Sequence, residues 1–315
     1  MASRIDKLVD QFEPKLRDAF LAAIEEVNAR ADVPRMVAAI ERGDIADAIE
    51  ALHLAPEAFS ELMDQLSEGF KAGGMDTMAS LPKLSSDAGQ MVVRFNARNE
   101  RAEQILRQYS SELVTEIVDD QRVAIRAALE AGMQRGQNPR AVALDIVGRV
   151  NPSTGRREGG IVGLTSMQEQ WSRNAQAELA STDPKLLKNY LQRAARDKRF
   201  DAVVRKAIEK GTPIDPANAA RMVQRYRDRL LRVRGETIGR TEALTSLHMG
   251  GYEARQQIVD SGAVEADAVG GIWRTNIDGR ERTTHKHMNG QFQRHGEPFV
   301  SPSGARLRSE ERRVG

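Results

Sequence analysis

Two consecutive stretches, "PANAARMVQRYRDRLLRV" (Pro216 to Val233) and "ETIGRTEALTSLHMGGYEARQQIV" (Glu236 to Val259), indicate the class of the fold. In the first stretch, apolar side chains recur every three or four residues, which is the period of a helix with one buried face. These side chains are Met222, Tyr226, Leu230 and Val233. We therefore expect two successive helices in this part of the chain.

The same period covers most of the chain before residue 260. An opening helix is predicted by apolar residues spaced four apart, at Leu8, Phe12, Leu16, Phe20 and Ile24. The longest helical stretch runs from Asn96 to Gly136, and Asn138 followed by Pro139 is a helix start. A helix that opens at Pro56 should end near Gly73 and Gly74, because a glycine pair stops a helix at little cost.

After Gly262 the pattern changes. The stretch "VGGIWRTNID" (Val269 to Asp278) suits a strand, and Asn289-Gly290 is the strongest short hairpin signal in the chain. The stretch "GEPFVSPSG" (Gly296 to Gly304) follows as strand and turn. The sequence therefore predicts a mainly α protein, with a multi-helix N-terminal body and a small C-terminal α+β unit.

Loops and changes of pattern suggest a linear division of the chain. The predicted parts are an N-terminal helical region (1–80), a long-helix region (90–150), a linker (151–163), a helical insertion (164–235), a C-terminal module (236–307) and a tail (308–315). The tail, "RSEERRVG", is the peptide that a widely used DNA-sequencing adapter encodes in one reading frame. We therefore expect the tail to be read-through after a truncated gene.

Composition limits the classes of function. The chain has 315 residues, and its formal net charge of +2 means that any nucleic-acid surface must be local. There is no cysteine, which excludes disulfides and thiolate metal sites from the printed sequence. No apolar run approaches the roughly 20 residues that cross a bilayer. We expect a soluble protein that acts or is assembled inside a cell, without contact to a membrane.

One basic surface is predicted on the stretch after Pro216. Arginines spaced four, four and three residues apart form a ridge on one side of the expected helix: Arg221, Arg225, Arg229 and Arg232. Such a ridge can bind phosphates or an acidic partner. The alternative is a solvated helix face whose arginine stems pack over apolar surface.

A second polar group spans "WRTNIDGRERTTHKHMNGQ" (Trp273 to Gln291) and the helix before it. One interpretation is a buried network of Arg240, Glu242 and Asp278 that pins the helix to the C-terminal hairpin. The other is an active site, in which Arg280, Arg282 and Lys286 clamp a phosphate and His285 acts as general acid or base. Metal binding by His285, His287, His295 and Asp278 is a weaker reading, and the sequence predicts neither a metal nor another cofactor.

The C-terminal third resembles the phage Mu protein F-like family, the minor head proteins of tailed bacteriophages. The resemblance rests on an ordered set of elements and not on any single one. In this sequence the set comprises Arg240, Thr241, Glu242, Tyr252, Trp273, Asp278, Arg280, Arg282, His285, Asn289, Gly290, Pro298 and Phe299. It covers residues 122–304 loosely and residues 238–304 closely.

The resemblance implies a non-enzymatic protein of head morphogenesis that is incorporated in the virion, in the head interior or at the portal. Its implied partners are the portal protein and inner capsid or scaffold proteins, with packaged DNA as a further candidate. Two alternatives stay open. One is a nuclease or nucleotide-transferring enzyme that uses Glu242, His285, Arg280 and Arg282. The other is a DNA-binding ejection protein that uses the arginine ridge.

Overall fold

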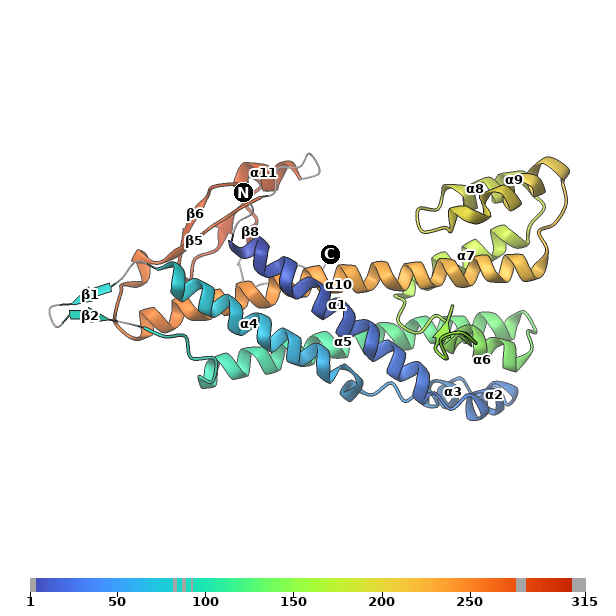
Figure 1. Ribbon diagram of the computed structural model, residues 1–315, viewed down its shortest axis with the longest axis horizontal. Coiled ribbons are helices and arrows are strands. Elements are labelled where there is room, and N and C mark those ends of the chain that lie inside the picture. Colours follow the sequence, from blue (N-terminus) through green and yellow to red (C-terminus); the bar gives the residue numbers. More distant parts are fainter. Residues whose placement is uncertain (1–3, 82–83, 87–88, 92, 276–281, 308–315) are drawn as a thin grey trace. The chain divides into compact units, whose positions relative to one another are not determined.

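The chain is mainly helical, as the sequence predicts (Figure 1). The structure is a computed structural model that describes residues 4–81, 84–86, 89–91, 93–275 and 282–307. Within these residues the α-helices are α1 (Arg4–Arg30), α2 (Val33–Glu41), α3 (Ile45–Glu50), α4 (Ser60–Ser80), α5 (Glu100–Gln134), α6 (Pro139–Val147), α7 (Ser166–Ala180), α8 (Pro184–Gln192), α9 (Asp201–Lys210), α10 (Pro216–Asp260) and α11 (Thr283–Met288).

Short strands and 3-10 turns complete the described chain. The 3-10 turns are η1 (Pro56–Phe59), η2 (Lys198–Phe200) and η3 (Ala266–Ala268). Each sheet is an antiparallel pair, formed by β1 (Leu84–Ser86) with β2 (Gly89–Met91), β3 (Arg149–Val150) with β4 (Arg157–Glu158), β5 (Gly270–Ile272) with β6 (Phe292–Arg294), and β7 (Phe299–Val300) with β8 (Arg306–Leu307). Sheets this small add little stability of their own, so the helices must supply the core.

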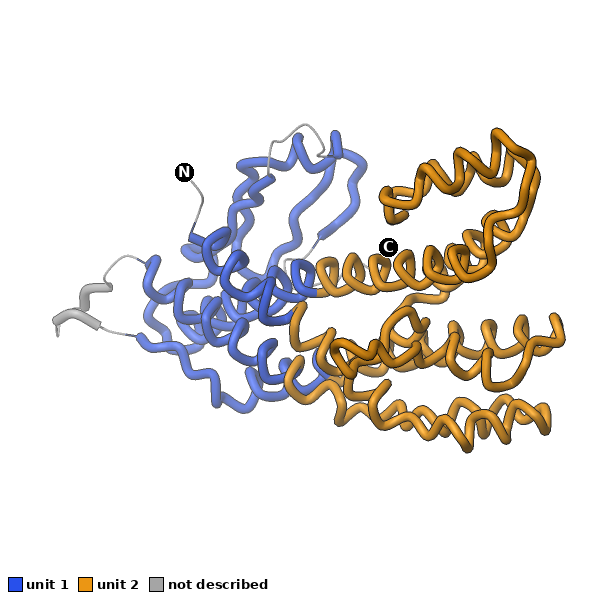
Figure 2. The backbone as a smooth tube through the Cα atoms, turned by 45° about the vertical axis from the view of Figure 1, so that its right-hand side comes forward, with its two compact units in different colours: residues 1–16, 63–110, 239–315 blue, residues 17–62, 111–238 orange. Residues whose placement is uncertain are grey.

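Two compact units, each built from segments far apart in the sequence, divide the chain (Figure 2). Unit 1 contains residues 1–16, 63–110 and 239–315, and unit 2 contains residues 17–62 and 111–238. The regions predicted from the sequence are contiguous, so their boundaries remain a division of the sequence and do not follow these units. The predicted tail, 308–315, lies outside the described residues.

Each unit has its own buried core. In unit 1, Phe70, Ala102 and Met249 form a cluster from α4, α5 and α10, against which Phe95 and Tyr109 pack. In unit 2 the rings of Phe20 and Phe59 lie with their centroids 6.5 Å apart, and both residues are fully buried. The apolar period read from the sequence therefore marks the core-facing side of the helices.

Local signals in the sequence set several helix ends correctly. The side chain of Asn138 accepts hydrogen bonds from the backbone N–H groups of Arg140 and Ala141, so α6 begins at Pro139 as expected. The predicted long helix from Asn96 to Gly136 is α5, which differs from the prediction by a few residues at each end. Frayed ends of this size are the least certain part of any helix assignment.

Helix α10 is one continuous helix of 45 residues, where the sequence suggested two. Gly235 lies inside it, and a Cβ at this position would meet the side chain of Leu21 at 3.2 Å. The exposed fraction of Val233 is 43%, so this residue does not belong to the buried stripe. The buried face instead continues through Leu230 to Arg234. The expected break and the expected position of Val233 are therefore wrong.

Helices α4 and α10 touch through their backbones within unit 1. A Cβ on Gly73 would overlap the carbonyl oxygen of Leu247, and a Cβ on Gly250 would overlap the carbonyl oxygen of Phe70. Only glycine permits this approach, since any other side chain would separate the helices. Helix α4 consequently runs through Gly73 and Gly74, where we expected it to end. These glycines serve helix contact and not helix termination.

The predicted linker, residues 151–163, is folded within unit 2. Its first part forms the turn between β3 and β4, where Arg149 pairs with Glu158 in the strand register. Its last part carries Ile161 and Val162, which are at most 2% exposed. Among the described residues, no helix combines the length and the apolar composition that crossing a membrane requires.

Replacing Gly250 with alanine is expected to lower the free energy of unfolding by about 2 kcal/mol, because overfilling a tight contact costs roughly 1–3 kcal/mol. The clash involves backbone atoms of α4, which cannot rotate away. Urea denaturation measures the effect. Gly235→Ala in the same helix is the control, because its neighbour is a flexible leucine side chain and alanine favours a helix. Equal losses in the two variants would contradict the assigned backbone contact.

Candidate functional site

Aromatic rings from three segments of the C-terminal module meet at Trp273. The ring of His285, on α11, lies edge-on to Trp273 with a centroid distance of 5.5 Å. The ring of Phe299, on β7, lies edge-on to it at 5.4 Å. Phe299 is 6% exposed. Edge-to-face packing of this kind stabilises an aromatic pair beyond its buried area, so these three residues form the core of a small module.

Hydrogen bonds fix the backbone around this core. The Trp273 indole N–H donates to Thr275 Oγ1 at 3.0 Å, and that hydroxyl donates to the carbonyl oxygen of His285 at 2.7 Å. The side-chain oxygen of Asn289 accepts from the N–H of Thr275 at 3.0 Å, and the N–H of Gly290 donates to the carbonyl oxygen of Trp273 at 2.8 Å. Residues of the predicted motif therefore bind one another.

Two local predictions for this module are corrected. Asn289-Gly290 forms a turn with a positive φ of 87° at Gly290, but the turn joins α11 to β6 and does not connect two strands. His285 and His287 lie on a helix and not on an extended segment, so they do not share the face that an alternating pattern implies. The strand paired with β6 is β5, which ends just before Trp273.

Glu242 is buried in unit 1. Its exposed fraction is 1%, and its carboxylate accepts a hydrogen bond from the hydroxyl of Tyr109 on α5. A buried carboxylate requires such partners, because leaving it without them costs far more than the bond itself contributes. Within this structure Glu242 connects α10 to α5, and it is closed to bulk solvent.

Arg240 and Glu242 point in different directions, as residues two apart on a helix do. Arg240 is exposed and forms an ion pair with Glu13 of α1 at 3.2 Å. Thr241 is also exposed. In the expected network of Arg240, Glu242 and Asp278, the first two residues therefore do not lie on the same face of α10. Asp278 and Arg280 lie outside the described residues, and their part in the predicted network stays a prediction.

Tyr252 of α10 packs against His295, the residue that follows β6. Its ring and the ring of His295 have centroids 4.5 Å apart. Gln256 Nε2 donates to Asp260 at 2.8 Å, which turns the other amide atom, Oε1, toward His295 as an acceptor. The hydrogen on His295 is therefore on Nε2, 2.9 Å from Gln256 Oε1. His295 Nδ1 is buried and has no hydrogen-bond partner among the described atoms.

Charges around His295 disfavour its protonated form. Burial lowers the pKa of His295, and the neighbouring Arg255 and Arg101 lower it further, while Asp260 and Glu253 oppose them. Arg101, on α5, donates to both Glu253 oxygens at 2.9 and 3.0 Å and also pairs with Asp260 at 2.7 Å. Both carboxylates near His295, those of Glu253 and Asp260, thus form ion pairs with Arg101.

The remaining predicted residues are exposed or half-buried. Arg282 is exposed directly before α11, and Pro298 is half-buried directly before Phe299. The four ridge arginines on α10 are all exposed, as predicted: Arg221, Arg225, Arg229 and Arg232. The ridge belongs to unit 2 and the Trp273 module to unit 1.

Two arginines on the same helix are buried, although the sequence pattern did not predict it. Arg227, 5% exposed, donates to Ser172 Oγ at 2.7 Å and to the carbonyl oxygen of Gly159 at 3.2 Å. Arg234, 8% exposed, donates to the carbonyl oxygen of Gly163 at 2.9 Å. Burial lowers the pKa of Arg234 to about 10. Their position on the buried stripe beside Leu230 was the available signal.

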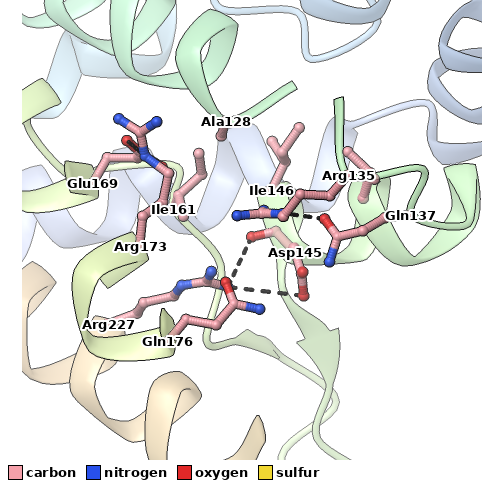
Figure 3. Close-up of a pocket in the computed structure, with 11 residues that line it drawn as sticks. Ala128, Arg135, Gln137, Asp145, Ile146, Ile161, Glu169, Arg173, Gln176 and Arg227 are labelled. Carbon is pink, nitrogen blue, oxygen red and sulfur yellow. Dashed lines mark hydrogen bonds and ion pairs between the residues drawn. The ribbon is translucent and has the colours of Figure 1, made fainter. Parts of the chain in front are cut away.

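Arg227 borders a small polar cavity in unit 2 (Figure 3). Glu169, 1% exposed, pairs there with Arg173 at 2.8 Å, and burial raises the pKa of Glu169 against the effect of that arginine. Asp145 lies 3.9 Å from Arg227. The cavity measures about 20 Å³, which leaves room for one water molecule. This cluster joins helices and is too small for a substrate.

Comparisons with protein-family models, with curated proteins and with solved structures find no match to this chain.

Tyr109→Phe is expected to lower the free energy of unfolding by about 1.5–3 kcal/mol, because a hydrogen bond to a buried charged group contributes about that much. The change removes one oxygen atom and keeps the ring. Arg240→Ala is the control, since it removes an exposed ion pair worth about 0–1 kcal/mol. Chemical denaturation compares the two. A loss for Tyr109→Phe no larger than the loss for Arg240→Ala would show that Glu242 does not depend on Tyr109.

Stability should fall when the pH drops below 6.5, the ordinary pKa of histidine, because the pKa of His295 is lower in the folded chain. The unfolded chain then binds a proton before the folded chain does. The stability that neutral His295 contributes is fully present above pH 6.5. It is lost as the pH falls toward the pKa of His295 in the folded chain. Thermal unfolding at about pH 7.5 and about pH 5.5 measures it.

His295→Gln should reduce this loss, because glutamine does not titrate, whereas His287→Gln on the exposed face of α11 should keep the wild-type loss. Both variants remove one histidine, so they separate the buried position from the residue type. The same pH dependence in wild type and His295→Gln would exclude His295 as its source.

Proposed function

We propose that this chain is a bacteriophage minor head protein of the Mu F-like type, acting in head morphogenesis. In this proposal it associates with the portal protein and with inner capsid or scaffold proteins in the host cytoplasm, and it is incorporated in the virion. The helical body supplies the contact with these partners. The module around Trp273 serves as a structural or docking element and carries out no reaction.

One observation carries most of the support. Some residues of the ordered family set, although separated along the chain, contact one another: Trp273 contacts His285, Phe299 and Gly290. Contacts between motif residues are expected where a sequence motif specifies a folded module. They are not expected where the same residues recur by chance along a helical chain.

The enzyme alternative receives less support. It requires Glu242 and His285 in one solvent-accessible cleft, yet Glu242 is 1% exposed and bound by Tyr109. A general acid or base must reach the proton that it transfers. The ring of His285 contributes an edge-on contact to Trp273, which is a packing role. These positions favour an assembly protein over an enzyme.

The proposal predicts that the chain co-purifies with portal protein in proheads and that its deletion abolishes infectious particles. Trp273→Ala should then reduce incorporation at least tenfold, measured by quantitative mass spectrometry of purified proheads. Trp171→Ala is the matched control, because Trp171 is 43% exposed on α7 and lies outside the module. Full infectivity of the deletion phage would refute the assembly role.

A second comparison separates the structural role of His285 from a catalytic one. His285→Phe keeps an aromatic ring against Trp273 and leaves the carbonyl oxygen that Thr275 binds. We expect this variant to support wild-type titres when it complements the deletion phage. Loss of infectivity with normal incorporation would favour the enzyme alternative, because a proton-transfer group would then be missing.

A further inference from the structure

The exposed face of α10 in unit 2 carries a row of arginines with regular spacing. Arg221, Arg225, Arg229 and Arg232 are all exposed. Because a helix rises 1.5 Å per residue, the row extends over about 16.5 Å with steps of about 4.5–6 Å. Asp228, three residues after Arg225 and four before Arg232, lies beside the row and is half-buried. The row therefore presents four exposed cationic groups with one half-buried carboxylate beside them.

Within the described part of unit 2, no carboxylate forms an ion pair with this row, although Asp197 and Asp228 lie near enough to Arg225 to interact with its charge. Arg221 hydrogen-bonds only to the amide oxygen of Asn218. The ion pairs recorded on α10 in this unit belong to Arg227 and Arg234, which are buried. Exposed arginines elsewhere in the unit do pair with acids, as Arg35 does with Asp47 at 2.6 Å. The row is thus available to an external anion.

A hollow of about 380 Å³ lies at one end of the row, where it is lined by Arg221, Arg225 and, from η2, Arg199. Arg199 forms an ion pair with Asp197 at 2.6 Å. Two carboxylates also line the hollow, but both are engaged by the protein. Asp228 accepts the N–H of Gly159 at 2.7 Å, and Glu158 accepts the side-chain N–H of Asn151 at 2.8 Å. The guanidinium groups of Arg221 and Arg225 are therefore the groups in this hollow best placed to bind a phosphate.

We propose that the row and its hollow bind the phosphate backbone of duplex DNA without reading its sequence. Guanidinium forks bind phosphate oxygens in pairs, which suits a helix face that carries four exposed arginines. A protein partner would need an apolar centre within the contact, and Val233 is the one large apolar side chain exposed on α10 among the described residues, which is too little for such a centre. The inference goes beyond the assembly role proposed above, and either can fail without the other.

Fluorescence anisotropy of the full chain with a mixed-sequence duplex of about 30 base pairs tests the proposal. Four phosphate contacts predict that affinity falls at least 100-fold between about 50 and about 200 mM KCl. The variant Arg225→Gln/Arg229→Gln/Arg232→Gln should bind at least tenfold more weakly at about 50 mM KCl. Its log–log salt slope should be smaller by about 2.7, which is about 0.9 for each lost contact.

The matched control removes three positive charges from other exposed positions of unit 2, in Arg30→Gln/Arg35→Gln/Arg42→Gln. It should retain wild-type binding and slope, and circular dichroism checks that both variants are folded. Three outcomes would overturn the proposal. These are no binding at about 50 mM KCl, equal weakening by both variants, or displacement of the duplex by polyglutamate at equal charge. The last outcome would assign the row to acidic proteins.

Discussion

The backbone contact between α4 and α10 is the constraint on which unit 1 depends. It brings Gly73 against Leu247 and Phe70 against Gly250, without side chains between the helices. This contact sets the position of the following turn of α10, from which Tyr252 supports His295 and Glu253 binds Arg101. A separation of the two helices by one methyl group would shift every one of these partners, since cores transmit strain and do not absorb it.

That constraint also explains which parts of the fold the sequence could predict. Helix starts with a side-chain cap, such as Asn138 before α6, are local and were read correctly. The apolar period identified the helices and their buried sides, with the exception of Val233. The role of a glycine inside a helix is not local, because termination and close contact require the same residue. Gly73 was misread for this reason.

For the candidate site too, local features could be predicted from the sequence and distant partners could not. The resemblance names Trp273, His285, Asn289 and Phe299 as motif residues, and in the structure the ring of Trp273 contacts the rings of His285 and Phe299. The sequence could not predict that Tyr109, more than a hundred residues earlier, is the partner of Glu242. Partners so far apart in the sequence produce no recognisable pattern of residue spacing. The conformation of the His-x-His segment depended likewise on its neighbours, and it is helical.

The arginines of α10 are divided by burial into two kinds with different energetics. Arg227 and Arg234 donate hydrogen bonds to backbone carbonyl groups, and Arg234 also pairs with an acid, so both stabilise unit 2. The exposed row does the opposite, because like charges three or four residues apart on a helix destabilise it by roughly 0.2–0.5 kcal/mol per pair. The three adjacent pairs, 221–225, 225–229 and 229–232, together cost about 1 kcal/mol.

Burial of Met222, Tyr226 and Leu230 on the other side of α10 offsets this repulsion, since a fully buried large apolar side chain contributes about 1.5–3 kcal/mol. The helix therefore tolerates the row, although the row does nothing for its stability. A polyanion lying on the row would remove the repulsion as well as add contacts of its own. Binding and the stability of unit 2 are then linked, because a ligand that binds only the folded state stabilises it.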